Sequence, residues 1–276
     1  MTTAPAPTAR TGDARPRDVA RQAVVAVSAL VAVVGAVVGS GALGGTPIAE
    51  AGGGALSATA TLVAPAGPAF AIWSVVYTGL VALAVHQLLP GRREDARQRR
   101  TGWWVAASLL LNAAWILTVQ AGQVSASVVV IAALLVVLVV AFGRLVRSRP
   151  ASRVEALVLD GTIGLYLGWV SIATVANTAA ALKQAGLTSA EPAWAVAVLA
   201  VAALVGVVVA RLGGGRLAYG AGLTWGLVWV AVGRSGDGES ASTTAAVAAA
   251  VAAVVVAAAT VAERLRSRSL SRAPRR

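Results

Sequence analysis

The sequence of 276 residues contains no cysteine, one histidine and one methionine. Without cysteine, the chain forms no disulfide and offers no thiolate as a nucleophile or metal ligand. One histidine is too few for a zinc site built from protein side chains alone. Charged residues are also scarce at 12%, about half the share of a soluble domain, whereas 58% of residues are hydrophobic. The composition therefore argues against thiol chemistry and a soluble domain, and it favours a membrane protein.

The 23 lysine and arginine residues follow a regular pattern along the chain. Apart from Lys183 and Arg234, they lie in the two tails and in every second connection between long apolar runs. Cytoplasmic loops of membrane proteins collect lysine and arginine, so both termini are predicted to be cytoplasmic. The net charge of +12 is spread over these segments rather than gathered in one stripe, so nucleic acid is not an expected partner.

Apolar runs of about 20 residues, the length of a membrane-spanning helix, recur along the chain. We expect eight transmembrane helices, at 20–43, 68–89, 103–120, 125–143, 156–182, 193–211, 217–233 and 244–263. Backbone groups in lipid must be satisfied within their own segment, so the predicted fold is an all-α polytopic bundle in the lipid bilayer. The first run could instead be a signal peptide. Its apolar core is longer than the roughly 7–15 residues of a signal, which favours a retained helix.

Four regions are expected along the chain. Residues 1–18, rich in Pro, Thr, Ala and Arg, are predicted to be disordered. Residues 19–183 hold five membrane helices, and residues 184–263 add a three-helix membrane segment. Residues 264–276 are predicted to be a basic cytoplasmic tail without fixed structure. The connection 44–67 is the longest, and loops of this length often serve as lids or binding loops.

Large aromatic and amide side chains recur at a similar depth on three of the expected helices, and on each helix the spacing places them on one face. Polar groups at membrane depth are expected to face the bundle interior. The three faces would then line a cavity suited to a hydrophobic small molecule. The alternative is that the aromatic residues simply pack. The set comprises Trp73, Tyr77, Asn112, Trp115, Tyr166, Trp169, Ala173 and Asn177.

Four further residues within the expected helices are interpreted as structural rather than functional. Asp160 lies close to the cytoplasmic end of its helix and is interpreted as a capping or snorkelling carboxylate rather than a proton relay. His86 could be an axial ligand of a haem iron, but a single histidine near a helix end is more typical of packing. No metal site is therefore predicted. Trp225 and Trp229 could extend the cavity or face lipid, and we expect them to pack.

Three segments of the sequence carry recognisable motifs. Residues 65–73 read Pro-Ala-Gly-Pro-Ala-Phe-Ala-Ile-Trp and are followed by Tyr77. Residues 109–115 read Leu-Leu-Leu-Asn-Ala-Ala-Trp, and residues 166–177 combine Tyr, Trp, Ala and Asn at the spacing Tyr-x-x-Trp-x-x-x-Ala-x-x-x-Asn. In this order, on the second, third and fifth expected helices, they resemble the motifs of the TspO/MBR family of translocator and tryptophan-rich sensory proteins. The resemblance covers about residues 20–183.

The resemblance implies a five-helix bundle with a ligand pocket under the first loop and no required cofactor. It also implies binding of a porphyrin such as protoporphyrin IX or haem, by Phe70 and the eight residues of the aromatic and amide set. Some bacterial members degrade porphyrin, and the matching tryptophans are Trp73 and Trp169, so an enzyme is the alternative to a sensory binding protein. The resemblance further implies an inner (plasma) membrane location and allows a homodimer.

The chain also departs from the family pattern. Pro68 stands where the family usually has tryptophan, and Thr178 follows Asn177, so the tyrosine of a fifth-helix sterol motif is missing. Sterol binding through that motif is not expected. Three helices follow the five, and they could cover a dimerisation face or form a partner module. A transporter ranks below a binding protein because no charged residue lies near the predicted midplane.

Overall fold

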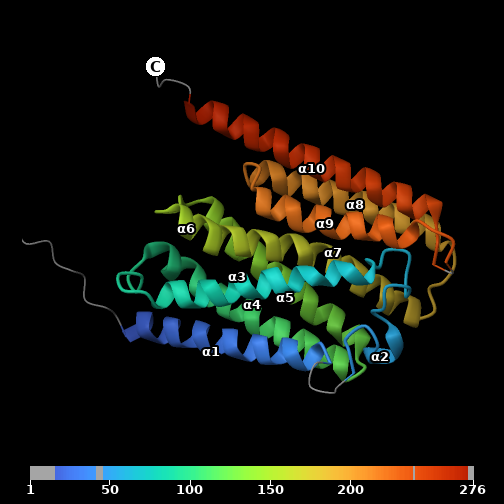
Figure 1. Ribbon diagram of the computed structural model, residues 1–276, viewed down its shortest axis with the longest axis horizontal. Coiled ribbons are helices and arrows are strands. Elements are labelled where there is room, and N and C mark those ends of the chain that lie inside the picture. The colour runs from blue at the N-terminus through green and yellow to red at the C-terminus, as the bar shows by residue number, and fades with distance from the viewer. Residues whose placement is uncertain (1–15, 42–45, 239, 273–276) are drawn as a thin grey trace, which may run out of the picture.

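The computed structural model describes residues 16–41, 46–238 and 240–272, and the regular structure of these residues is helical. Eight long helices run side by side along one axis (Figure 1). They are α1 (Pro16–Gly39), α3 (Ile72–Leu88), α4 (Ala96–Gln120), α5 (Val124–Val146), α7 (Thr162–Gln184), α8 (Glu191–Leu212), α9 (Leu217–Arg234) and α10 (Thr243–Arg272). The short helices are α2 (Ala51–Gly54), the 3-10 turn η1 (Gly67–Ala71), α6 (Arg153–Glu155) and the π-helical η2 (Ala156–Gly161).

Within the described residues, seven helices are long and apolar enough to cross a membrane, with η1 continuing into α3 and α6 and η2 continuing into α7. The eighth long helix, α9, has 18 residues and lies where the seventh crossing is expected. Its glycines, tryptophans and terminal Arg234 lower its mean hydropathy below that of its neighbours. The prediction of an all-α polytopic bundle is confirmed.

The start of α1 and the end of α10 lie at the same end of the bundle, together with the basic turns 89–95, 147–152 and 213–216 (Figure 1). We call this end the terminal end. The opposite end carries the loop 46–71, the turn 185–190 and residues 235–238 and 240–242, and we call it the loop end.

The structure corrects the predicted extent of both tails. Helix α1 begins at Pro16, so residues 16–18 are helical, and proline is well suited to the first turn of a helix. Asp18 accepts hydrogen bonds from Arg99 of α4 at 2.6 and 2.8 Å. Helix α10 continues to Arg272, so residues 264–272 are not an unstructured tail. Arginine and leucine are good helix formers and sustain this extension. The remainder of each predicted tail lies outside the described residues.

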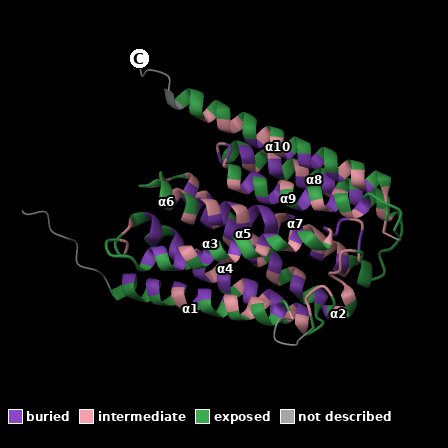
Figure 2. Ribbon diagram, in the orientation of Figure 1, coloured by how far each residue is buried: buried purple, intermediate pink, exposed green. Residues whose placement is uncertain are grey.

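Helices α7 and α9 meet along a seam of glycines that joins the last three helices to the first five. A Cβ atom on Gly222 would lie 2.4 Å from the carbonyl oxygen of Leu165, and one on Gly168 would lie 2.3 Å from that of Tyr219. The backbones are therefore in direct contact, as in membrane helix pairs with small residues four positions apart. The inward faces of the helices are buried and the outward faces exposed (Figure 2).

A buried ion-pair network ties α4, η2 and α9 together at the terminal end. The Asp160 carboxylate accepts hydrogen bonds from Arg97 at 2.9 and 3.0 Å and pairs with Arg216. Arg97 also pairs with Glu155 at 2.7 Å. Asp160 is thus neither a helix cap nor a snorkelling carboxylate. It lies in a π-helical turn and pairs with Arg97 of α4 and with Arg216, the residue before α9.

Candidate functional site

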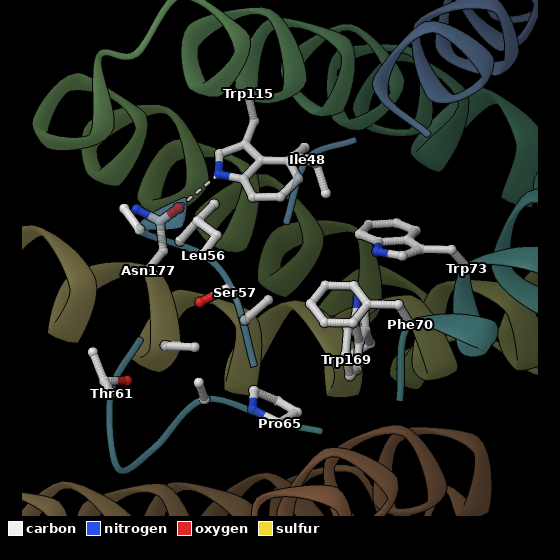
Figure 3. A pocket seen from close by; sticks show the side chains of 14 residues that line it. Ile48, Leu56, Ser57, Thr61, Pro65, Phe70, Trp73, Trp115, Trp169 and Asn177 are labelled. Carbon is white, nitrogen blue, oxygen red and sulfur yellow. Dashed lines mark hydrogen bonds between the residues drawn. The ribbon is translucent and has the colours of Figure 1, made fainter. Parts of the chain in front are cut away.

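An enclosed cavity of about 40 Å³ lies beneath the loop at the loop end, and Figure 3 shows the side chains around it. Four aromatic residues from η1, α3, α4 and α7 turn their rings toward it, namely Phe70, Trp73, Trp115 and Trp169. The loop forms its roof. The roof residues are Ile48, Ala55, Leu56, Ser57, Thr61, Ala64 and Pro65.

A larger groove of about 540 Å³, which we call the lateral groove, adjoins the enclosed cavity and lies between α1 and α3. The two share Ile48, Phe70, Trp73 and Trp115 in their walls. The groove opens sideways, because its lining residues include Val37 of α1, which is 38% exposed. Its volume falls within the roughly 300–1,000 Å³ of ordinary small-molecule sites, whereas the enclosed cavity alone is far smaller.

The aromatic rings form one contact cluster centred on Trp73. Its ring centroid lies 5.4 Å from that of Tyr77, 5.9 Å from Tyr166 and 6.2 Å from Trp169. Phe70 meets Trp169 edge-on at 5.7 Å. These separations are typical of stabilising aromatic pairs, each contributing about 0.5–1.5 kcal/mol beyond burial. The cluster presents fixed ring faces and edges to both hollows.

Trp169 is almost fully buried, and its indole N–H has no hydrogen-bond partner among the described residues. A buried donor left unpaired costs about 1–3 kcal/mol, so such a group is unusual in a folded protein. In the wall of a cavity it is a ready donor for an acceptor atom on a ligand.

Hydrogen bonds between helices fix the neighbouring side chains. The Trp115 indole N–H donates to the Asn177 side-chain oxygen at 2.9 Å (Figure 3), and the Asn177 amide donates to Ser127 of α5 at 2.9 Å. On the other side, the Asn112 amide donates to the Tyr77 hydroxyl at 2.7 Å. Amides that could have faced a ligand are therefore partly engaged in holding the aromatic walls.

The structure brings the nine residues proposed from the sequence into one region but gives them different places. Asn112 and Tyr166 are buried behind the aromatic wall and are not among the described lining residues. Tyr77 lines only the lateral groove. The enclosed cavity is lined by Phe70, Trp73, Trp115, Trp169, Ala173 and Asn177.

Arg234, at the end of α9, holds the roof in place. Its guanidinium donates to the carbonyl oxygens of Thr61 and Ser240, each at 3.1 Å, and to that of Ala58. The residue is only 1% exposed. The sequence contains a signal for this contact, since Arg234 is one of only two basic residues on that side of the predicted membrane. Sequence reasoning alone does not connect it with the site.

Two tryptophans of α9 continue the same attachment. The Trp225 indole N–H donates to the Ala69 carbonyl at 2.9 Å, and the Ala66 N–H donates to the Trp229 carbonyl at 3.0 Å. Their rings meet edge-on at 5.7 Å. They do not line the described cavity. Trp229 packs against the core as expected, whereas Trp225 is 38% exposed, and both contact the segment that leads into α3.

His86 is buried on α3, and its Nε2 has no partner among the described residues. It does not appear in the described lining of the cavity or the lateral groove. Across the described residues, no group of three or more His, Asp or Glu is arranged to hold a metal ion.

Comparison with known proteins gives one family. The model of a family described as TSPO-like protein matches residues 24–261. No curated protein and no solved structure matches the chain. The match runs beyond the 20–183 of the motif resemblance and includes α8, α9 and most of α10. On this match, together with the helical bundle and its aromatic cavity, the chain belongs to the TSPO-like protein family.

Proposed function

We propose that this membrane protein binds a tetrapyrrole, such as protoporphyrin IX or haem, between its aromatic cavity and the groove beside it. The supporting observation is that Phe70, Trp73 and Trp115 wall both hollows, next to the unpartnered N–H of Trp169. Indole and phenyl faces stack on a flat macrocycle, and a buried N–H offers one directional contact. The protein would then act as a sensor or carrier of the ligand.

The volumes indicate how such a ligand would enter. The enclosed cavity of about 40 Å³ cannot hold a macrocycle, whereas the groove of about 540 Å³ can. Trp73 faces both spaces, but Trp169 lines only the enclosed one. A macrocycle would therefore first lie in the groove against Trp73. It would reach Trp169 only when the roof moves away.

The ligand's acidic groups need a place outside the aromatic wall. The described lining of cavity and groove contains no charged side chain. We therefore place the porphyrin propionates at the mouth of the groove near the loop, where water and backbone N–H groups are within reach. The opposite edge of the porphyrin ring then lies toward α3.

We also propose an orientation of the protein in the membrane. Basic turns gather at the terminal end, so we place that end in the cytoplasm and the loop end outside the plasma membrane. The α7 face that bears the glycine seam is covered by α9. A homodimer would have to use another face.

A second candidate is an enzyme that degrades the bound porphyrin in light. It is favoured by the approach of two indoles, Trp73 and Trp169, whose centroids lie 6.2 Å apart. An indole close to a photoexcited macrocycle can transfer one electron to it, which leaves an indole radical cation and a reduced macrocycle. Molecular oxygen from solution would then be the oxidant that accepts the electron and cleaves the ring. The enzyme hypothesis requires the porphyrin to contact both tryptophans.

The test is a titration of the detergent-purified protein with protoporphyrin IX in the dark, followed by the porphyrin absorption band. Replacing Trp73 with leucine removes an aromatic contact of about 1 kcal/mol and should weaken binding about fivefold. Trp103→Leu is the matched control, because Trp103 is 47% exposed and lies outside the described cavity lining. No saturable binding by the wild type would refute the proposal.

Illumination then separates the two candidates. A stable absorption band under light supports a sensor or carrier. Loss of the band that disappears in Trp73→Phe/Trp169→Phe, while dark binding persists, supports the enzyme. Ligand flux into liposomes, with no such photochemistry, would favour a transporter instead.

A further inference from the structure

A second groove, separate from the aromatic site, runs between α7 and α8. It consists of two hollows of about 320 and 400 Å³ that share Thr174, Val175, Trp194 and Val198. Helix α8 packs mainly on α10 and has few contacts with α7. The groove is the space left between these two helices.

The walls of this groove are apolar and open to the surrounding bilayer. Val201 and Val205 line it and are 59% and 45% exposed. The lining extends along α8 from Glu191 to Val209, which is about 27 Å at the rise of an α-helix. One leaflet of hydrocarbon is about 15 Å thick, so the groove can receive a single acyl chain over its whole depth in that leaflet.

The mouth of the groove at the loop end carries one positive and one negative charge. Lys183 Nζ lies 3.4 Å from Glu191 Oε1, and both side chains are partly exposed. This pair complements a zwitterionic headgroup, whose phosphate would meet the lysine and whose ammonium would meet the glutamate. An anionic headgroup would meet the lysine but be repelled by Glu191. Trp194, 58% exposed, flanks the mouth as interfacial tryptophans do.

A buried hydroxyl adds an independent observation. Thr61 lies in the wall of the hollow of about 320 Å³ and is 5% exposed. Its Oγ1 has no hydrogen-bond partner among the described residues. The ester carbonyls of a phospholipid lie just below its headgroup, and Thr61 lines the same hollow as Lys183 and Glu191 at the mouth. A carbonyl there would satisfy the donor that the protein leaves unpaired.

We propose that the α7–α8 groove binds a zwitterionic phospholipid from the leaflet at the loop end. Its headgroup contacts Lys183 and Glu191, an ester carbonyl accepts from Thr61, and one acyl chain lies along Val198 and Val201. Thr61 also lines the aromatic cavity, so the lipid would pack against the segment that roofs the other site. The inference is independent of the tetrapyrrole proposal.

The experiment uses the full chain in lipid nanodiscs that contain a trace of phosphatidylethanolamine with a photoactivatable diazirine in its acyl chain. After illumination, mass spectrometry maps the cross-linked residues. We expect cross-links concentrated on the groove faces of α7 and α8, at several times the yield of a phosphatidylglycerol probe with the same chains. An equal yield from the two probes would overturn the assigned headgroup.

Two variants of α8 separate specific binding from ordinary lipid contact. Val198→Trp fills the groove and should lower the cross-link yield at least fivefold. Leu204→Trp is the matched control, because Leu204 is 63% exposed and is absent from the described lining. If Val198→Trp does not fold, Val201→Phe blocks the same groove from a more exposed position. Equal yields in blocked and control variants would refute the site, leaving only bulk lipid contact.

The mouth is tested by exchanging its charges. Glu191→Gln removes the group that repels an anionic headgroup and should abolish the preference for phosphatidylethanolamine over phosphatidylglycerol. The double variant Lys183→Glu/Glu191→Lys restores a pair of opposite charges and should recover most of it. An unchanged preference in Glu191→Gln would contradict the assigned headgroup contact.

Discussion

Removing the guanidinium of Arg234 should loosen the roof of the aromatic cavity. The side chain is buried and bonds the carbonyl oxygens of Ala58 and Thr61 in the roof. A hydrogen bond from a charged donor contributes about 1.5–3 kcal/mol. Glutamine is too short to make both contacts and carries no charge. With the lower figure for each contact, Arg234→Gln should lower the local stability of the roof by about 3 kcal/mol.

Hydrogen exchange followed by mass spectrometry measures this change directly. The amide N–H groups of Ala64 and Ala66 are hydrogen-bonded in the folded roof, to Thr61 and Trp229. A loss of about 3 kcal/mol raises the population of the open roof about 100-fold, and exchange at these amides should accelerate by a similar factor. Because the open roof exposes Trp169, protoporphyrin IX that lies in the groove should also reach Trp169 faster.

Two further variants sharpen the test. Arg234→Lys keeps the charge, but an ammonium cannot reproduce the fork of a guanidinium, so exchange should fall between wild type and Arg234→Gln. Arg211→Gln removes the same charge from a side chain that is 70% exposed and should change nothing in the roof. Unchanged exchange at residues 58–66 in a folded Arg234→Gln protein would refute the reasoning, because the roof would then be held by its own turns.

Two other substitutions test the joints between helices by thermal unfolding in detergent. Gly222→Ala places a methyl group 2.4 Å from the Leu165 carbonyl oxygen and should destabilise the protein by about 1–3 kcal/mol, whereas Gly238→Ala, with open space around it, should be neutral. Asp160→Asn leaves Arg97 paired with Glu155 alone and should lower stability by about 1.5–3 kcal/mol. A midpoint equal to that of wild type in either case would contradict the packing or the ion pairing described.

The helices could be placed from the sequence because lipid makes the length of an apolar run decisive. Their ends could not, since polar residues that extend a helix beyond the hydrocarbon leave no hydropathy signal. Helix α4 starts at Ala96, with the Asp95 carboxylate accepting from the N–H groups of Arg97 and Gln98. The predicted span began at 103. The same limitation explains the missed helical residues at the ends of α1 and α10.

The site was predictable only where it follows helical spacing. Trp73 and Tyr77, or Trp169 and Asn177, share faces that any helical wheel shows. The roof has no such period. Its anchor, Arg234, lies 173 positions from Thr61, and a hydrogen bond across that distance leaves no local pattern. The groove between α7 and α8 likewise depends on how far apart two helices stand, which neither helix encodes alone.

The sideways opening between α1 and α3 changes what a measured affinity would mean. A ligand that enters there leaves the bilayer and not water, so the concentration that governs occupancy is its mole fraction in lipid. A strongly lipophilic ligand would thus appear to bind more weakly as lipid or detergent is added at constant protein, although the contacts with Trp73 are unchanged. Occupancy in a cell would follow the concentration of the ligand in the membrane, so the protein would respond to the composition of the bilayer that surrounds it.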